Sequence, residues 1–213
     1  MATKTLAVLS RKGGAGKTTL TAHLGVLAHE AGLRVLMLDA DPQGSLSYWS
    51  DLREAEQPEI HTCTPTEVPE LIKTATNVGF DLVLVDSAPA HSSDISLLAK
   101  HSDYVVIPTR PALFDIAAVG ATIEIITALK KRGCIVLNAT QAPRGVGEAS
   151  LTTDARAALA DEGLPVAPFS VAQRAVLGRS LISGSAVTET EPKGKASSEL
   201  RKLWQWIEGE LNG

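Results

Sequence analysis

The segment at residues 10–19, SRKGGAGKTT, has the residue types of a phosphate-binding loop. The common pattern of such loops is G-x-x-x-x-G-K-[ST]. Gly16, Lys17 and Thr18 match the end of this pattern, but Arg11 stands where the first glycine belongs. A further lysine, Lys12, precedes Lys17 by five residues. The common pattern does not explain this second lysine.

Each residue type near the end of the loop suits a contact with a phosphate group. Gly13, Gly14 and Gly16 allow the backbone to turn tightly, so that its N–H groups can point inward at phosphate oxygens. A helix that begins at Lys17 adds the positive end of its dipole. We expect Lys17 to reach the β- and γ-phosphates of a nucleotide and Thr18 to bind Mg²⁺ through its hydroxyl.

Three carboxylates follow apolar runs further along the chain. Asp39 and Asp41 end the run in LMLDADPQG, and Asp86 ends the run in VLVDSAP. Each could simply terminate a strand, but the carboxyl ends of parallel strands meet at one edge of a sheet. Mg²⁺ prefers hard oxygen ligands, and a carboxylate near a γ-phosphate can orient an attacking water. The sequence therefore predicts that these carboxylates surround the glycine-rich loop.

Alternating strands and helices must position these residues. Short apolar runs predict strands at 5–10, 34–40, 80–89, 104–109 and 134–140, with a weaker candidate at 166–171. Helical periodicity predicts helices at 17–31, 45–54, 66–78, 92–101, 112–131, 150–162 and 197–211. This alternation favours an α/β fold with a doubly wound, mostly parallel sheet and helices on both faces, as in P-loop NTPases. We expect one domain over residues 1–213.

The C-terminal part of the chain carries two further expectations. The segment 184–198, GSAVTETEPKGKASS, is polar and predicts a mobile loop. The helix expected at 197–211 has one apolar stripe, which we expect to pack on the sheet. A partner-binding helix is the alternative. The stripe consists of Leu200, Leu203, Trp204, Ile207 and Leu211.

Composition limits the class of protein. The hydrophobic content is 44%, the charged content 21% and the net charge −4, as expected of a soluble globular protein and not of one whose entire surface binds nucleic acid. The expected location is the cytoplasm, because the apolar run near the N-terminus is too short for a signal peptide. Cys63 and Cys134 form no C-x-x-C pair and are expected to be buried, reduced and not bound to metal. No stretch approaches the roughly 20 apolar residues that span a bilayer.

The motifs together resemble the ParA/MinD family of ATPases, whose phosphate loop deviates from the common form. The resemblance rests on KGGAGKTT, DADPQGS, VDSAP and VIPTRPALFDIAA, and on the later segment AVLGRSLISGSAVTE. The resemblance runs from residue 5 to about residue 190. Within the family, the chain is similar to the small ParA partition proteins of the ParF kind.

This resemblance implies a role for each matching residue. Lys12 matches the signature lysine, which in the family crosses an ATP-dependent dimer interface to the partner's nucleotide, so Lys12 and Lys17 would serve two nucleotides. Asp41 matches the residue that positions the hydrolytic water. The implied catalytic residues are Lys12, Lys17 and Asp41, and the implied metal-site residues are Thr18, Asp39 and Asp86. The implied nucleotide-binding residues are Lys12, Gly13, Gly14, Ala15, Gly16, Lys17, Thr18, Thr19 and Asn138.

Some positions stay open. Asn138 is expected near the adenine, although an asparagine at a strand end is equally typical of a turn. The segment 108–115 resembles the part of the family that lies near the nucleotide and the dimer interface. The family often has Thr-Pro-Pro after the Walker B aspartate, whereas here the chain reads Ser87-Ala88-Pro89. Arg11 has no role that the resemblance implies.

The resemblance implies a positioning switch that binds ATP or ADP with Mg²⁺. It would dimerise with ATP, bind DNA non-specifically on the nucleoid, and be stimulated by a ParB-like or cargo-adaptor protein. The cargo could be a plasmid, a protein organelle or transfer DNA. Residues 171–213 hold six basic and five acidic side chains, so either a DNA-binding patch or ordinary solvated helix faces is possible there. The basic candidates are Arg174, Arg179, Lys193, Lys195, Arg201 and Lys202.

Other functions of this fold are less consistent with the sequence. A membrane-positioning relative like MinD would need a basic amphipathic end, but KLWQWIEGELNG has little positive charge. An iron–sulfur enzyme would need ligating cysteines, and a GTPase would need Asn-Lys-x-Asp where the chain has Asn138-Ala139-Thr140-Gln141. A metabolic P-loop synthetase or kinase stays an alternative.

Overall fold

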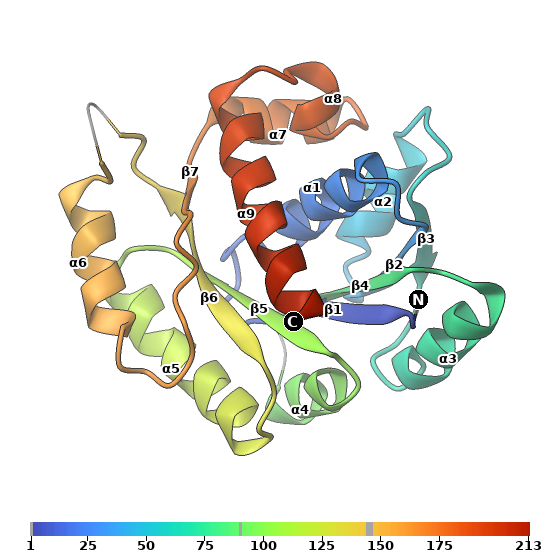
Figure 1. Cartoon of the computed structure of the whole chain (residues 1–213), viewed down its shortest axis with the longest axis horizontal. Helices are drawn as coiled ribbons and strands as arrows, with labels where there is room; N and C mark the ends of the chain where they lie inside the picture. Colours follow the sequence, from blue (N-terminus) through green and yellow to red (C-terminus); the bar gives the residue numbers. More distant parts are fainter. Residues whose placement is uncertain (1, 90, 144–146) are drawn as a thin grey trace.

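A seven-stranded parallel sheet forms the centre of the computed structural model, which describes residues 2–89, 91–143 and 147–213 (Figure 1). The strand order is β3-β2-β4-β1-β5-β6-β7, and each neighbouring pair runs parallel. The strands are β1 (Lys4–Val8), β2 (Val35–Ala40), β3 (Glu59–Thr62), β4 (Leu82–Ser87), β5 (Tyr104–Thr109), β6 (Gly133–Thr140) and β7 (Val171–Ala172).

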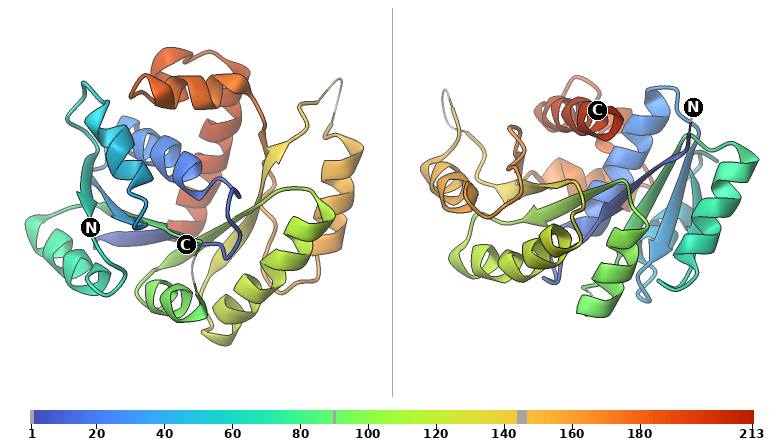
Figure 2. Two further views of the ribbon diagram at one scale, coloured as in Figure 1. Left: turned by 180° about the vertical axis from the view of Figure 1, so that it is seen from behind. Right: turned by 60° about the horizontal axis from the view of Figure 1, so that its bottom comes forward.

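Helices follow the strands and cover both faces of the sheet (Figure 2). They are α1 (Lys17–Glu30), α2 (Ser45–Asp51), α3 (Val68–Val78), α4 (Ser92–Lys100), α5 (Leu113–Ala128), α6 (Ser150–Leu159), α7 (Ala175–Ile182), α8 (Val187–Thr190) and α9 (Lys195–Asn212).

Alternate residues of each central strand enter two separate apolar cores. On β1, Leu6 and Val8 pack with α1 and α9, whereas Ala7 packs with α3 to α6 on the opposite face. Strands buried on both faces must be apolar throughout, which explains the continuous apolar runs of the sequence. The expected α/β architecture with a parallel sheet is confirmed.

The topology brings the chemically important loops to one edge of the sheet. β1 is paired with β4, and β4 with β2, so their carboxyl ends are adjacent. In this register Asp86 lies opposite Val8 on one side and opposite Asp39 on the other. The glycine-rich loop leaves β1 at the same edge and enters α1, as crossovers in a doubly wound sheet require.

Four elements differ from the sequence-based expectation, and the first is α7, where no helix was expected. β3 was not predicted, because this short edge strand is half exposed and lacks an apolar run. The expected strand at 166–171 is reduced to one isolated bridge at Val166 and to β7, which begins at Val171. The expected mobile loop at 184–198 is wrong in structure, since α8 and the start of α9 occupy it.

Burial explains this last difference. Ala186, Val187 and Thr188 are buried, and Ser197 donates to the carbonyl of Val187 at 3.0 Å. The polar composition of the segment therefore did not indicate that residues 184–198 form a packed corner between α7, α8 and α9. The apolar stripe of α9 is buried as expected, in the core that α9 shares with α1.

The two cysteines have different environments. Cys134 is fully buried on β6, as expected, whereas Cys63 is only half buried beyond the end of β3. Over the part of the chain that the structure describes, no helix combines the length and apolar character needed to cross a bilayer.

Candidate functional site

The glycine-rich loop adopts a backbone conformation that favours glycine at two positions. Gly14 has φ 71° and Gly16 has φ 91°, both in the left-handed region. The side-chain amide of Asn138 packs against this turn and donates from Nδ2 to the carbonyl of Ala15 at 2.8 Å. A Cβ on Gly16 would lie 2.1 Å from that Nδ2 atom, so the close approach also requires glycine.

The two lysines of the loop lie in different environments. Lys17 is buried, and its Nζ donates to the carbonyl of Lys12 at 3.4 Å. Burial lowers the pKa of Lys17, and the nearby carboxylates of Asp86 and Asp41 oppose that shift. Lys12 is half buried and Arg11 is exposed. Lys17 is therefore directed into the site, whereas Lys12 lies at its rim.

Asp86 receives hydrogen bonds from two threonines of α1. Thr18 donates to Oδ2 at 2.6 Å and Thr21 donates to Oδ1 at 3.2 Å. The pKa of Asp86 is raised to about 7, mainly by burial and also by the charge of Asp39, although the hydrogen bonds from Thr18 and Thr21 and the charge of Lys17 lower it. A buried acid held this way needs additional positive charge to stay ionised, which a divalent cation would supply.

Asp39 is held by the first turn of α2. The backbone N–H and the hydroxyl of Ser47 both donate to its Oδ2 atom at 2.8 Å. Asp41 is turned toward its own loop, where Gln43 N–H donates to Oδ1 at 2.9 Å. The three carboxylates are buried at the same sheet edge as Lys17.

These residues fit a nucleotide with Mg²⁺. The hydroxyl of Thr18 and the carboxylates of Asp39 and Asp86 are the hard oxygen ligands that Mg²⁺ takes, and Mg²⁺ sites commonly use few protein ligands beside substrate phosphates and water. No group of three or more His, Cys, Asp or Glu side chains that could hold a metal ion occurs among residues 2–89, 91–143 and 147–213.

A cavity of about 160 Å³ adjoins the other side of the loop. Gly14, Gly16, Arg110, Asn138 and Gln173 contribute to its lining. Arg110 belongs to the segment 108–115, so this segment does lie beside the loop. The position suits the base or ribose of a nucleotide whose phosphates occupy the loop, although the amide nitrogen of Asn138 already contacts Ala15.

Sequence reasoning missed two residues of this site. Thr21 follows Thr18 by one helical turn, and this spacing could have identified it as a second donor to Asp86. Ser47 lies on the first turn of α2 after the aspartates, where a hydroxyl can serve a carboxylate at the preceding strand end.

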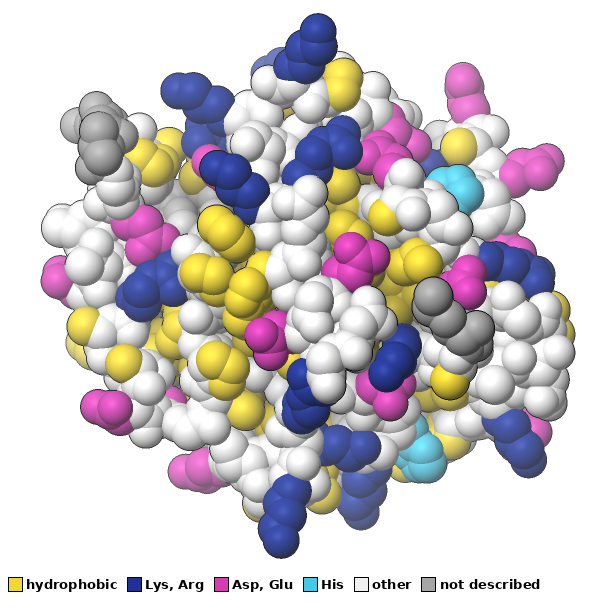
Figure 3. All heavy atoms as spheres, viewed as in Figure 1, with side chains coloured by type: hydrophobic (Ala, Val, Ile, Leu, Met, Phe, Trp, Pro, Cys, Tyr) yellow, Lys and Arg dark blue, Asp and Glu magenta, His cyan; other side chains and the backbone are white. Residues whose placement is uncertain are grey.

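The basic residues near the C-terminal end divide into two groups. Arg174 is paired with Glu199 at 2.5 Å and Arg201 with Glu30 at 2.9 Å. The second group is exposed and forms no ion pair within the described part of the chain. It consists of Arg179, Lys193, Lys195 and Lys202. Figure 3 shows Lys and Arg side chains gathered at the top of the view, over α7, α8 and the start of α9.

Comparison with known proteins decides the family. Residues 6–185 match the model of the CobQ/CobB/MinD/ParA nucleotide-binding domain. The chain belongs to this family. The matched span covers the glycine-rich loop and all three carboxylates, and the resemblance to ParA/MinD proteins is confirmed.

Individual relatives of this ParA/MinD protein span nearly its whole length. The maintenance of carboxysome distribution protein A of Halothiobacillus neapolitanus is 32% identical over 205 residues, which cover 92% of this chain and 91% of that protein. The ATP complex of a Cyanothece McdA variant superposes with a TM-score of 0.79 at 19% identity, over 99% of this chain and 97% of that one. The septum site-determining protein MinD of Pyrococcus horikoshii, complexed with Mg-ADP, gives 0.79 at 18% identity and 96% coverage of both chains.

Proposed function

We propose that this ParA/MinD-type protein is an ATP-driven positioning switch in one domain, and that it hydrolyses ATP to ADP and phosphate with Mg²⁺. The observation that carries the proposal is the arrangement at the carboxyl edge of the sheet. There a buried lysine and three buried carboxylates surround a loop shaped by glycines. Solved structures of the same fold with ATP and with Mg-ADP support this nucleotide chemistry.

Each residue has a distinct part in this proposal. Lys17 and the loop N–H groups bind the phosphates of ATP, with the dipole of α1 adding to their attraction. Thr18, Asp39 and Asp86 hold Mg²⁺, which when bound offsets negative charge on the phosphates. Asp41 orients the attacking water, and its unshared oxygen is the acceptor for that purpose.

Lys12 acts on a second copy of the chain. Two ATP-bound faces repel each other because both carry negative phosphates, and a lysine from each side offsets this repulsion. The rim position and half-buried state of Lys12 support this assignment. Dimerisation then depends on ATP.

The dimer binds DNA without sequence preference and thereby attaches to the nucleoid. Arg179, Lys193, Lys195 and Lys202 are the candidates for phosphate contacts, because Arg174 and Arg201 already neutralise glutamates. The similarity to a carboxysome distribution protein over 91% of its length favours a large protein assembly as cargo over a plasmid. A cargo-adaptor protein stimulates hydrolysis and releases the dimer from the DNA.

Retention on a random-sequence DNA duplex tests the proposal. The measurement compares ATP, ADP and no nucleotide over a series of salt concentrations. We expect retention only with ATP, and a steep loss as salt rises, because phosphate contacts form with the release of counterions. Hydrolysis of ATP without DNA retention under any condition would reject the positioning role in favour of a metabolic ATP-dependent enzyme.

A further inference from the structure

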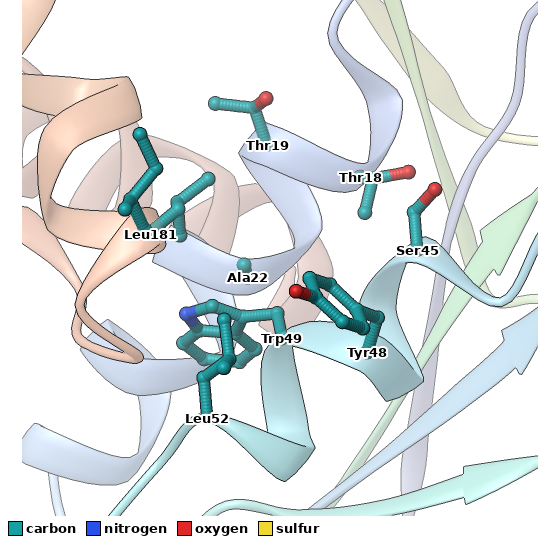
Figure 4. A pocket seen from close by; sticks show the side chains of 9 residues that line it. Thr18, Thr19, Ala22, Ser45, Tyr48, Trp49, Leu52 and Leu181 are labelled. Carbon is teal, nitrogen blue, oxygen red and sulfur yellow. The ribbon is translucent and has the colours of Figure 1, made fainter.

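A second, apolar pocket lies next to the loop-side cavity, and Thr19 of α1 contributes to the lining of both. It has a volume of about 380 Å³ and is formed by α1, α2 and the end of α7. Figure 4 shows the side chains that line the pocket: Tyr48 and Trp49 from α2, Leu181 from α7, and Ala22 from α1 between them. This volume lies in the range of pockets that bind ligand groups.

The rim of the pocket exposes large apolar side chains. Tyr48 is 68% exposed and Ile182 is 79% exposed, and Leu52 at the end of α2 is also exposed. Clustered exposed apolar residues around a preformed pocket are typical of protein interaction sites, where aromatic residues contribute much of the binding energy.

No charged side chain is among the described ones that line the pocket, but the segment on either side of the rim residue Leu52 is acidic. After Tyr48, the exposed ionisable side chains of α2 and the following loop are all acidic: Asp51, Glu54 and Glu56. Arg53 does not offset them, because its side chain is buried and paired with Glu189 at 2.9 Å. On the α7 side, Arg179 is exposed one turn before Ile182. The α2 side therefore attracts cationic groups.

The pocket also touches elements that hold the candidate magnesium ligands. Thr18 lines it, and the Thr18 hydroxyl donates to Asp86. Ser45 lines it as well, two residues before the Ser47 that holds Asp39. A group bound here would contact the first turns of both α1 and α2, and could alter the positions of Thr18 and Asp39.

We propose that this pocket is the docking site of the regulatory partner, a segment of another protein that inserts a bulky apolar side chain and places Lys or Arg beside α2. This proposal rests on the proposed ATPase function, and it places the partner's stimulation of ATP hydrolysis at this pocket. Docking changes the rate of ATP hydrolysis because it acts on the turns that carry Thr18 and Ser47.

Selection from a displayed random-sequence peptide library tests the site. The full chain with ATP is the target, and Ile182→Asp is used for counter-selection. We expect enriched peptides to combine a large apolar residue with Lys or Arg, to lose at least about tenfold in affinity on Ile182→Asp, and to change the rate of ATP hydrolysis of the unmodified chain. The double variant Asp51→Lys with Glu54→Lys is expected to weaken the same peptides, because it reverses the acidic side of the rim.

Val78→Asp is the matched control, since Val78 is another exposed apolar residue and lies at the end of α3. Peptides that bind Ile182→Asp and the unmodified chain equally, or that are acidic, would overturn the proposal. So would a loss of ATP-dependent dimerisation in Ile182→Asp without peptide, because a second copy would then occupy the pocket. ATP binding and DNA retention are measured on the same protein without peptide, so a failure of the proposed function is recognised separately.

Discussion

At the scale of single residues, the two lysines of the loop separate by environment. Lys17 is buried between carboxylates and bonded to the loop backbone. Lys12 is half buried at the rim, and within the described residues its ammonium group has no ion-pair partner. A lysine placed this way is available to a group that comes from outside the chain.

Lys12→Ala is expected to keep ATP binding but to lose ATP-driven dimerisation. Removing one cation from each side leaves phosphate charge uncompensated at the interface, so the association constant should fall at least about tenfold. Sedimentation with ATP and with ADP measures this, with Lys100→Ala on α4 as a matched surface control. Equal dimerisation of Lys12→Ala and the unmodified chain would remove Lys12 from the interface.

Asp41→Ala is expected to bind ATP and to form a persistent dimer. Loss of the residue that orients water should lower kcat by about 100-fold or more. Phosphate release measures the rate, and Asp154→Ala, an exposed carboxylate on α6, serves as the control. Turnover near the normal rate in Asp41→Ala would transfer the role to another group.

At the scale of elements, α2 connects the nucleotide edge to the corner between α7 and α8. Its first turn holds Asp39 through Ser47. Arg53, just after the end of α2, donates to the carbonyls of Gly184 and Gln57. It also forms a bidentate ion pair with Glu189. The guanidinium also lies over the ring of Trp49, 4.6 Å from its centroid. The contacts of α2 and Arg53 therefore join the Asp39 loop to the corner next to the basic residues.

Arg53→Met is expected to lower the free energy of unfolding by about 3 kcal/mol, because the change breaks the ion pair with Glu189 and removes the donor to two carbonyls. The Arg53 side chain is 3% exposed, which makes the loss larger than for a surface pair. Urea unfolding measures it. Lys73→Met is the control, since the Lys73–Glu70 pair is mostly exposed and should change stability by less than about 1 kcal/mol. Equal effects of the two changes would contradict this account of the corner.

At the scale of the whole molecule, one buried histidine links stability to pH. His23 of α1 accepts a hydrogen bond at Nδ1 from the backbone N–H of Val187 at 3.3 Å, which places its ring proton on Nε2. Burial lowers the pKa of His23 to about 4. The ring is therefore neutral in the folded protein at pH values where an unfolded histidine is partly charged.

The unfolded chain binds more protons at this residue between pH about 6.5 and about 4, so the folded state loses stability as pH falls through this window. The expected loss is about 3 kcal/mol. Urea unfolding at several pH values, compared between the unmodified chain and His23→Gln, isolates this residue from the titrating carboxylates. An identical pH dependence in both proteins would show that His23 does not contribute.

Local patterns in the sequence were sufficient for the order of elements and for the residues of the loop. Glycines at fixed spacing, a lysine and a threonine at the start of a helix, and acidic residues after apolar runs are features of short segments, and strand alternation follows from burial on both faces. The parallel topology then brings Asp39 and Asp86 together, because neighbouring parallel strands end at the same edge.

Only the tertiary structure decided which distant residues support one another. Asn138 contacts Ala15 across the loop, and Arg53 contacts Glu189 over 136 positions of sequence. The same holds for the packed corner that looked like a polar loop, and for the pocket between α1, α2 and α7. Such contacts depend on how complete layers pack, and packing energies come from the joint shape of many side chains, which no short segment of the chain encodes by itself.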